Sequence, residues 1–241
     1  MSNNILFIFE GAKTEVQIIQ NLQKFFVNEN LNIHCIFGGE IYQIFKEIKA
    51  DENLDTFNLL KERSPKNEEV LKNYTRDDFA EIYLFFDYDG HSKVADDVRL
   101  RELLDFFSEE TDKGKLYISY PMVEALKHIS DFDEFKDSCV SCKKNMNYKK
   151  IVSDESQKHL IDFKNYDVEI WKLLISTHLK KMNYLCDNKF LLPIQLFTQS
   201  RIFSDQITKY ITPHSKVAVL SSFPVFVHDY YGNENTLLKI R

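Results

Sequence analysis

Two uninterrupted apolar segments, each followed by an acidic residue, constrain the fold of this chain more than any other feature of its sequence. Residues 5–9 run directly into Glu10, and residues 82–86 run directly into Asp87. A short, unbroken apolar run is typical of a strand that is buried on both faces. Such strands belong to mostly parallel sheets covered by helices on both sides. The two segments therefore predict an α/β fold.

Helical spacing alternates with strand-like runs through the first half of the chain. Thr14 is a good N-cap, and apolar residues recur after it at helical spacing as far as Phe26. The pattern predicts strands at 5–9, 31–37, 82–86 and 115–119, and helices at 14–26, 41–48, 94–107 and from Pro121. Residues 1–128 are therefore expected to form an α/β domain with a mostly parallel sheet flanked by helices, with a linker or irregular insertion at 50–77.

The pattern changes after about residue 129. Residues 155–182 and 193–211 have mainly helical spacing, whereas 216–221 and 224–228 resemble late strands. We therefore expect residues 129–241 to form a mainly helical C-terminal lobe, with the late strands as candidates to return to the sheet.

The charge balance excludes a protein with a broad basic coat. The chain has 31 Lys and Arg against 37 Asp and Glu, a formal charge of −6. Lysine pairs at 143–144, 149–150 and 180–181 are typical of solvated faces. If the chain acts on a nucleic acid, contact must come from a local basic patch, bound metal or a partner chain.

Cysteine usage and the N-terminus indicate a reducing compartment. The four cysteines are too few for a disulfide framework, and the Cys139-x-x-Cys142 pair lacks the second ligand pair that a structural zinc site needs. The first apolar run is far shorter than a signal sequence core or a membrane span. We therefore expect a soluble, cytoplasmic protein.

Acidic residues follow three of the predicted strands. Glu10 follows the first, Asp87 and Asp89 end the third, and Glu124 lies in the first turn of the helix after the fourth. The carboxyl ends of parallel strands share one edge, where ligands bind. Converging carboxylates suit Mg²⁺, and would repel one another without a cation. Each acid alone also fits a cap, a solvated loop or, for Glu124, a helix dipole, so the prediction depends on the combination.

That combination resembles the Toprim domain, the catalytic module of topoisomerases, primases and several nucleases. The form with Thr-Glu after the glycine is most similar to defence-associated Toprim nucleases, namely the OLD, RloB and PARIS types and abortive-infection proteins. A topoisomerase or primase would need further domains, for which 241 residues leave no room. The resemblance covers about residues 1–128 and rests on FEGAKTE at 9–15, FFDYD at 85–89 and YPMVE at 120–124.

The resemblance implies a metal-dependent nuclease. Glu10 would be a metal ligand or the general acid/base, and Asp87 and Asp89 would hold Mg²⁺ or Mn²⁺. Glu124 would add a ligand. Glu15 would reach a second metal, although a capping role beside the N-cap of its helix fits equally well.

Phosphate contacts are also implied. Gly11 would let the backbone approach the phosphate closely, and Lys13 would join the catalytic residues. Lys93 and His91 follow Asp89 closely enough to contact the substrate, although His91 also fits a polar turn.

The family pairs some of its nucleases with an ATPase that senses infection, so the resemblance implies an ATPase partner and a toxic role in anti-phage defence. The substrate would be RNA, including tRNA, or DNA, and the sequence is compatible with an oligomer. The chain has no Walker-type loop of its own.

Two alternatives stay open from the residues. The sequence Asp87-Tyr88-Asp89-Gly90 also resembles the motif of haloacid-dehalogenase-like phosphatases, in which Asp87 would be the nucleophile. The second alternative is a non-catalytic Toprim-like binding or regulatory module.

Overall fold

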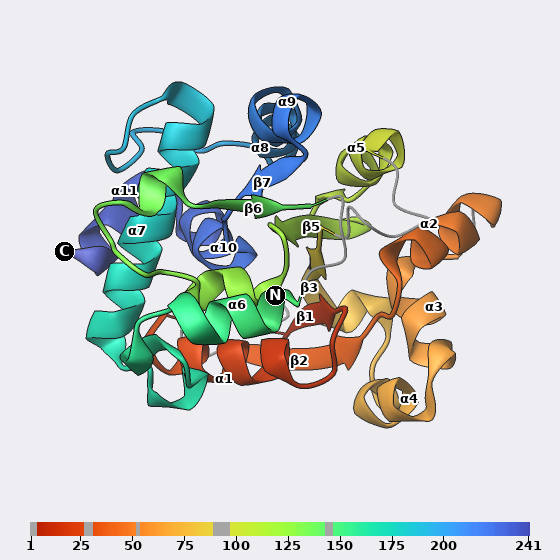
Figure 1. The fold of residues 1–241 in the computed structure, drawn as a ribbon. Helices are drawn as coiled ribbons and strands as arrows, with labels where there is room; N and C mark the ends of the chain where they lie inside the picture. The colour runs from red at the N-terminus through yellow and green to blue at the C-terminus, as the bar shows by residue number, and fades with distance from the viewer. Residues whose placement is uncertain (1–3, 27–30, 52–53, 89–96, 143–146) are drawn as a thin grey trace.

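The computed structural model describes residues 4–26, 31–51, 54–88, 97–142 and 147–241 (Figure 1). The strands are β1 Asn4–Phe9, β2 Asn32–Phe37, β3 Phe79–Asp87, β4 Ser108–Glu109, β5 Gly114–Ser119, β6 Cys139–Ser141 and β7 Lys216–Ala218. The helices are α1 Thr14–Phe26, α2 Ile41–Ala50, α3 Thr56–Arg63, α4 Pro65–Leu71, α5 Asp97–Phe106, α6 Tyr148–Glu155, α7 Val168–Asp187, α8 Gln199–Gln206, α9 Thr212–His214, α10 Ser222–Tyr231 and α11 Asn233–Ile240. None of these described helices has the length and apolar character needed to cross a bilayer.

The main sheet has five strands in the order β2-β1-β3-β5-β4. The first four of these are parallel to one another, and the two-residue strand β4 pairs antiparallel at the edge. Strands β1 and β3 occupy the middle, where every apolar side chain of 5–9 and 82–86 is buried. The prediction of an α/β fold with a mostly parallel sheet flanked by helices is therefore confirmed.

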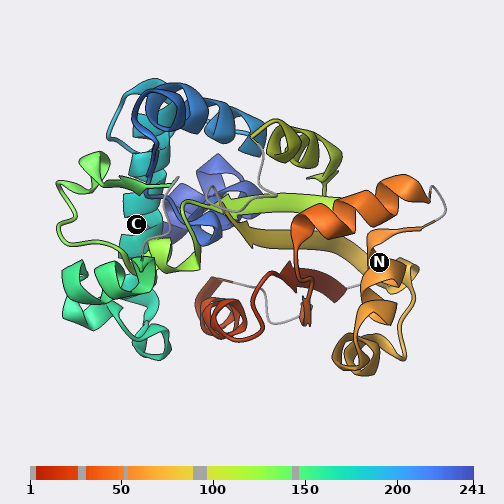
Figure 2. The ribbon, with the colours of Figure 1, turned by 45° about the vertical axis from the view of Figure 1, so that its right-hand side comes forward.

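Helices cover both faces of the sheet. Figure 2 shows α2 and α5 on one side of the strands and α1 on the other. This distribution is the one that right-handed crossovers require, because α1 leads from β1 to the outer strand β2 whereas α5 leads from β3 to β5 on the opposite flank. Helix α10 packs on the α1 side, where the Phe226 ring centroid lies 5.3 Å from that of Phe7.

The segment 224–228 was predicted to be a strand, and this prediction is wrong. It forms the middle of α10, whose side chains from Ser222 to His228 are all buried. A helix that is apolar all round has the same sequence pattern as a buried strand. The ring of Phe223 stacks on that of Phe85 at 4.9 Å between centroids. The C-terminal half therefore contributes a helix, rather than this strand, to the face of the sheet.

Two further expectations are corrected, and the start of a third segment lies outside the described residues. The late strand at 216–221 shortens to β7, which pairs with β6 in a separate two-stranded sheet, and a single bridge joins Tyr120 to Leu220. Pro121 precedes a 3₁₀ helix, Val123–Lys127, instead of opening an α-helix. The helix expected at 94–107 is described from Asp97 onward. Buried apolar side chains of both halves form one cluster.

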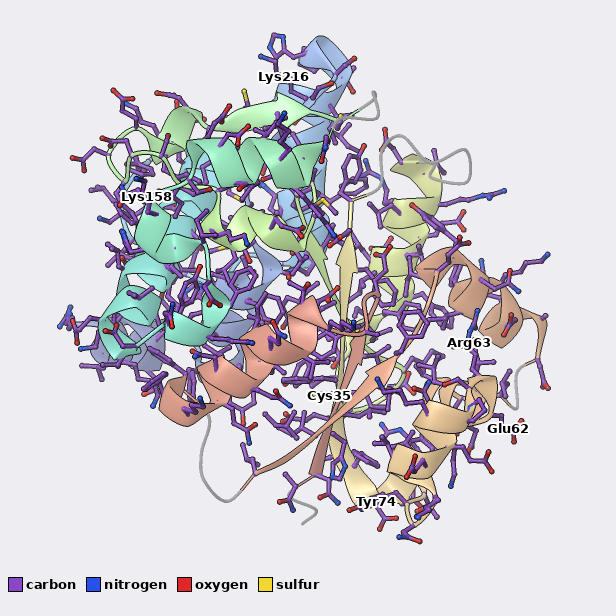
Figure 3. All side chains as sticks on the ribbon, turned by 60° about the horizontal axis from the view of Figure 1, so that its bottom comes forward. Cys35, Glu62, Arg63, Tyr74, Lys158 and Lys216 are labelled. Atoms are coloured by element: carbon purple, nitrogen blue, oxygen red, sulfur yellow. The ribbon has the colours of Figure 1, made fainter. Side chains whose placement is uncertain are left out.

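The supposed linker at 50–77 contains helices α3 and α4, which cover the edge strand β2. In Figure 3, Glu62, Arg63 and Tyr74 mark this insertion, and Cys35 lies on β2. The buried Asn67 side chain accepts a hydrogen bond from the Phe37 N–H at 3.1 Å and donates to its C=O at 2.8 Å. The insertion thereby satisfies backbone groups that an open sheet edge would expose.

Lys181 of α7 is a fully buried cation far from the ends of the central strands. Its Nζ donates hydrogen bonds to the backbone carbonyls of Lys136, at 2.6 Å, and Ser138, at 2.8 Å. Burial lowers the pKa of Lys181 from its ordinary 10.5 to about 7. Since the unfolded chain keeps the higher value, it binds more protons than the folded protein between these two pH values, and stability rises with pH across that window.

We predict that Lys181→Met flattens this pH dependence. The wild type should gain up to about 1.4 kcal/mol of unfolding free energy per pH unit from this group above pH 7. The variant should lose the gain, and should also be less stable overall because two carbonyls lose their donor. Urea unfolding between pH 6 and 9 measures both effects. Lys180→Met, at the half-exposed neighbour, is the control, and equal pH slopes for wild type and Lys181→Met would contradict the assignment.

Candidate active site at the carboxyl edge of the sheet

Glu10 and Asp87 meet where β1 and β3 end. The Asp87 N–H donates a hydrogen bond to Glu10 Oε2 at 3.0 Å, and the Glu10 N–H donates to the Phe85 carbonyl at 3.2 Å. The chain leaves β1 toward β2 and leaves β3 toward β5, so these adjacent strands flank the topological switch point of the sheet. In open α/β sheets, ligands bind in the crevice at this point.

Glu15 enters the same crevice from the first turn of α1. Its side chain is buried, and its Oε1 accepts a hydrogen bond from the Gly11 N–H at 3.0 Å. A Cβ on Gly11 would lie 2.6 Å from both carboxylate oxygens of Glu15. A side chain at position 11 would therefore require the Glu15 carboxylate to move, and the predicted contact of Gly11 with substrate phosphate stays a prediction.

Glu124 reaches the crevice from the 3₁₀ helix that follows β5. Its side chain is 6% exposed, and its Oε1 lies 3.5 Å from Lys149 Nζ. The second carboxylate oxygen, Oε2, is buried and has no hydrogen-bond partner among the described residues. The preceding residue, Val123, directs its backbone N–H at the Asp87 carboxyl. A buried carboxylate oxygen without a donor is costly unless a ligand completes its shell.

The electrostatics show that the four acids act on one another. Burial raises the pKa of Asp87 well above its usual range, and the charges of Glu10, Glu15 and Glu124 raise it further. Burial also raises the pKa of Glu15, to which the charge of Glu124 contributes. Four acids from three segments of the chain therefore share one negative site, and all four are among the residues for which the sequence analysis expected a metal.

The donor chemistry of this site fits a hard divalent cation. Every acidic side chain in it offers carboxylate oxygens, and no described residue is a hydrogen-bond partner of Glu124 Oε2. Within the described residues, however, no three His, Cys, Asp or Glu side chains already stand in an arrangement that could hold a metal ion. Asp89, the second acid of the Asp-x-Asp motif, lies outside the described residues.

Helix α6 adds residues that sequence alone did not single out. Lys149 was expected on a solvated face, yet it pairs with Glu124. Its neighbour Tyr148 is buried, with its hydroxyl 2.9 Å from His128 Nδ1, and His128 Nε2 lies 3.1 Å from Glu155 Oε2. Burial, followed by the charges of Glu124 and Asp87, raises the pKa of Tyr148. No sequence spacing links this helix to the ends of the strands. Only the fold therefore brings Lys149, Tyr148 and His128 to the acids.

The other predicted phosphate contacts are less well defined. Lys13 is exposed in the loop between β1 and α1, and no ion pair among the described residues involves it. His91 and Lys93 lie outside the described residues. Among the described residues, Lys149 forms an ion pair with one of the acids, Glu124.

No family model, curated protein or solved structure matches this chain. The site must therefore be interpreted from its own geometry and chemistry.

We predict that Asp87→Asn stabilises the metal-free protein. The amide oxygen still accepts the Val123 N–H, whereas one of the mutually repelling charges is removed. At pH 7 in chelator the melting temperature should rise, by an amount that corresponds to about 1 kcal/mol. Thermal unfolding measures the shift, with Asp154→Asn on the exposed face of α6 as the matched control. A lower melting temperature for Asp87→Asn would show that the acids do not repel one another there.

We also predict that Mg²⁺ raises the melting temperature of the wild type and raises that of Asp87→Asn much less. A cation that binds the folded state stabilises it by mass action, and the variant lacks one charged ligand. The same unfolding experiment with and without Mg²⁺ measures this. Identical Mg²⁺ responses in the two proteins would place any bound cation elsewhere.

Proposed function

We propose that this chain is a divalent-metal-dependent nuclease that hydrolyses phosphodiester bonds. The observation that carries the proposal is the meeting of Glu10, Glu15, Asp87 and Glu124 at the switch point of the sheet, where Glu124 Oε2 is buried and has no partner in the part of the chain that the structure describes. These positions coincide with those that the Toprim resemblance implies for metal ligands. A Toprim arrangement of the domain is part of the same proposal.

The residues divide the work in a simple way. Glu10 and Asp87 would hold Mg²⁺ or Mn²⁺, with Asp89, Glu124 and Glu15 as the additional carboxylates. Such an ion polarises the phosphodiester and lowers the pKa of attacking water.

Lys149, 3.5 Å from Glu124, supplies a positive charge to the substrate phosphate that shares the site. Because Tyr148 is anchored to the buried ring of His128 at 2.9 Å, the start of α6 is held firmly beside the acids. This fixed cation supports phosphate binding.

The biological role proposed with this activity is a toxic effector in anti-phage defence, restrained or triggered by an ATPase partner. The net charge of −6 is compatible with this role. A nuclease without a general basic coat captures its substrate through a local site.

The direct test is cleavage of single-stranded RNA, tRNA and DNA by the purified protein with Mg²⁺ or Mn²⁺. We expect cleavage that chelator abolishes and that Glu10→Gln and Asp87→Asn each reduce by about a hundredfold or more. Lys149→Met should reduce it by about tenfold or more, through loss of one charge near the phosphate.

Asp154→Asn, on the exposed face of α6, should cleave as the wild type does. Hydrolysis of a phosphomonoester without nuclease activity would instead favour a phosphatase with Asp87 as nucleophile. Full cleavage by both Glu10→Gln and Asp87→Asn would refute the proposed site.

A further inference from the structure

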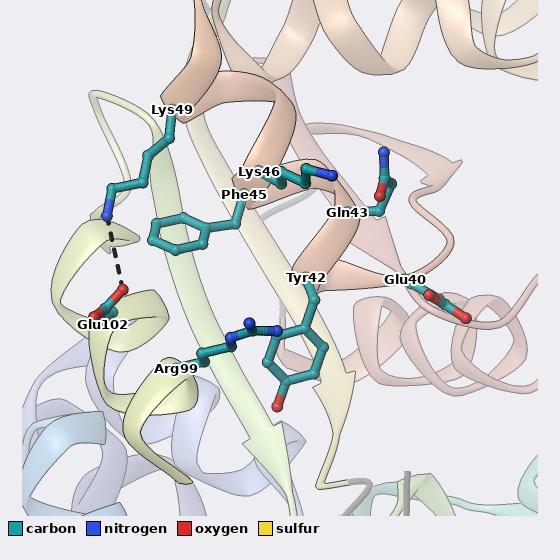
Figure 4. A pocket seen from close by; sticks show the side chains of 8 residues that line it. All are labelled: Glu40, Tyr42, Gln43, Phe45, Lys46, Lys49, Arg99 and Glu102. Atoms are coloured by element: carbon teal, nitrogen blue, oxygen red, sulfur yellow. Dashed lines mark ion pairs between the residues drawn. The ribbon is translucent and has the colours of Figure 1, made fainter. Parts of the chain in front are cut away.

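A pocket of about 550 Å³ lies between α2 and α5, on the face of the sheet opposite α10. Figure 4 shows its lining side chains, which include two aromatic rings, Tyr42 and Phe45. Its volume is in the range of sites that bind small organic ligands. Of the described residues at the acid site, Glu10, Glu15, Asp87, Glu124 and Lys149 are all outside its lining.

Short connections join this pocket to the acid site. The Gly38 N–H donates to the carbonyl of Phe9, the residue before Glu10, at 2.8 Å, and α2 begins three residues after Gly38. On the other wall, the hydroxyl of Tyr88, the residue after Asp87, donates to Asp97 at 2.8 Å. Asp97 is the first residue of α5. Both walls of the pocket therefore start at the carboxyl edge of the sheet.

The charges in the pocket differ from those of the chain as a whole. Lys49 lies 3.7 Å from Glu102, so these two side chains largely offset each other. Lys46 and Arg99 form no ion pair or side-chain hydrogen bond with any residue that the structure describes, and Glu40 is the remaining acid of the lining. Among the described lining residues, three basic and two acidic side chains leave a charge of +1, in a protein whose net charge is −6.

The aromatic rings give the pocket a second chemical character. Phe45 is 8% exposed and is held edge-on against Phe106, 5.1 Å away between centroids. Tyr42 is half-buried, and Figure 4 shows it with Arg99 at the end of the pocket toward which β3 and β5 run. Since Phe45 is buried and Lys49 Nζ lies 4.7 Å from its ring centroid, the ring available to a ligand is that of Tyr42. An accessible ring beside unpaired cations is the combination that binds single-stranded nucleic acids, with a base against the ring and phosphates against Lys and Arg.

We propose that this pocket binds unpaired nucleotides of the nucleic acid whose backbone reaches the acid site, so that the substrate is single-stranded at that place. The proposal rests on the proposed nuclease function for its link to cleavage. A base that is paired inside a duplex cannot reach Tyr42, because its faces are stacked on its neighbours. A strand that crosses the carboxyl edge of the sheet places one phosphate at Glu10 and Asp87 and its neighbouring nucleotides between α2 and α5.

The test measures binding apart from cleavage. Labelled single strands of RNA and DNA of about ten nucleotides, a length in the range that such grooves cover, are titrated against Asp87→Asn protein in chelator by fluorescence anisotropy. Adding Lys46→Glu and Arg99→Glu together should weaken binding at least tenfold. It should also reduce the slope of log affinity against log salt by about 1.4, the value for two lost phosphate contacts on a single strand. Adding Tyr42→Ala instead should weaken binding at least fivefold through lost stacking.

The control is Arg101→Glu, on the exposed side of the same helix α5 and outside the pocket. It carries the same charge change and should alter binding less than twofold. A blunt duplex of the same sequence should bind more weakly than the single strand and should be insensitive to the pocket variants. Unfolding curves check that each variant is folded, as expected for the exposed positions 46, 99 and 101 and tested separately for the half-buried Tyr42.

The outcomes separate this proposal from the proposed function. If the single strands bind and the pocket variants weaken that binding, the pocket assignment holds even if no cleavage is found. If the Lys46→Glu and Arg99→Glu protein binds single strands as tightly as the Arg101→Glu protein, or if the duplex binds as well as the single strand, the pocket assignment fails even where metal-dependent cleavage is present.

Discussion

The parallel pairing of β1 with β3 is the constraint on which the rest of the site depends. It sets Phe9 opposite Phe85 and therefore brings Glu10 next to Asp87, residues that are 77 positions apart in sequence. A slip of one residue would turn every side chain of a strand to the other face of the sheet. Because the side chains of these strands are buried on both faces, that slip would disturb both packed layers at once, and the register is correspondingly well determined.

Bringing acids together is unfavourable for the folded chain, and the fold offsets part of the cost locally. Backbone N–H groups of Asp87, Gly11 and Val123 point at the carboxylates of Glu10, Glu15 and Asp87. The charge of Lys149 partly compensates that of Glu124, whose second oxygen, Oε2, has no donor among the described residues. Such incomplete compensation is typical of sites where function, rather than stability, decides the arrangement.

Much of the fold and part of the site could be predicted from the sequence. Buried strands have a distinct pattern, and the order of strands and helices restricts how they connect, so the edge shared by Glu10, Asp87 and Glu124 followed from topology. The segment 224–228 failed because an all-apolar run does not distinguish a buried helix from a buried strand. Lys149 and His128 could not be foreseen, since their approach to the acids depends on tertiary packing of α6. The role of Asn67 could not be predicted, because it lies in a charged, weakly periodic segment. It binds the sheet edge through side-chain hydrogen bonds, which leave no periodic pattern in the sequence.

The packing of α10 has a consequence for how this chain can be divided. Phe223 and Phe226 cover Phe7 and Phe85, and Asp229 accepts a hydrogen bond from Tyr117 and pairs with Lys115 of β5. Separation of the first 128 residues from the remainder would expose the aromatic rings on this face of the sheet. It would also remove the Asp229 carboxylate from Lys115 and Tyr117. The acids would then be carried by a sheet with one exposed aromatic face, so the carboxyl edge depends for its solubility on a helix from the far end of the chain.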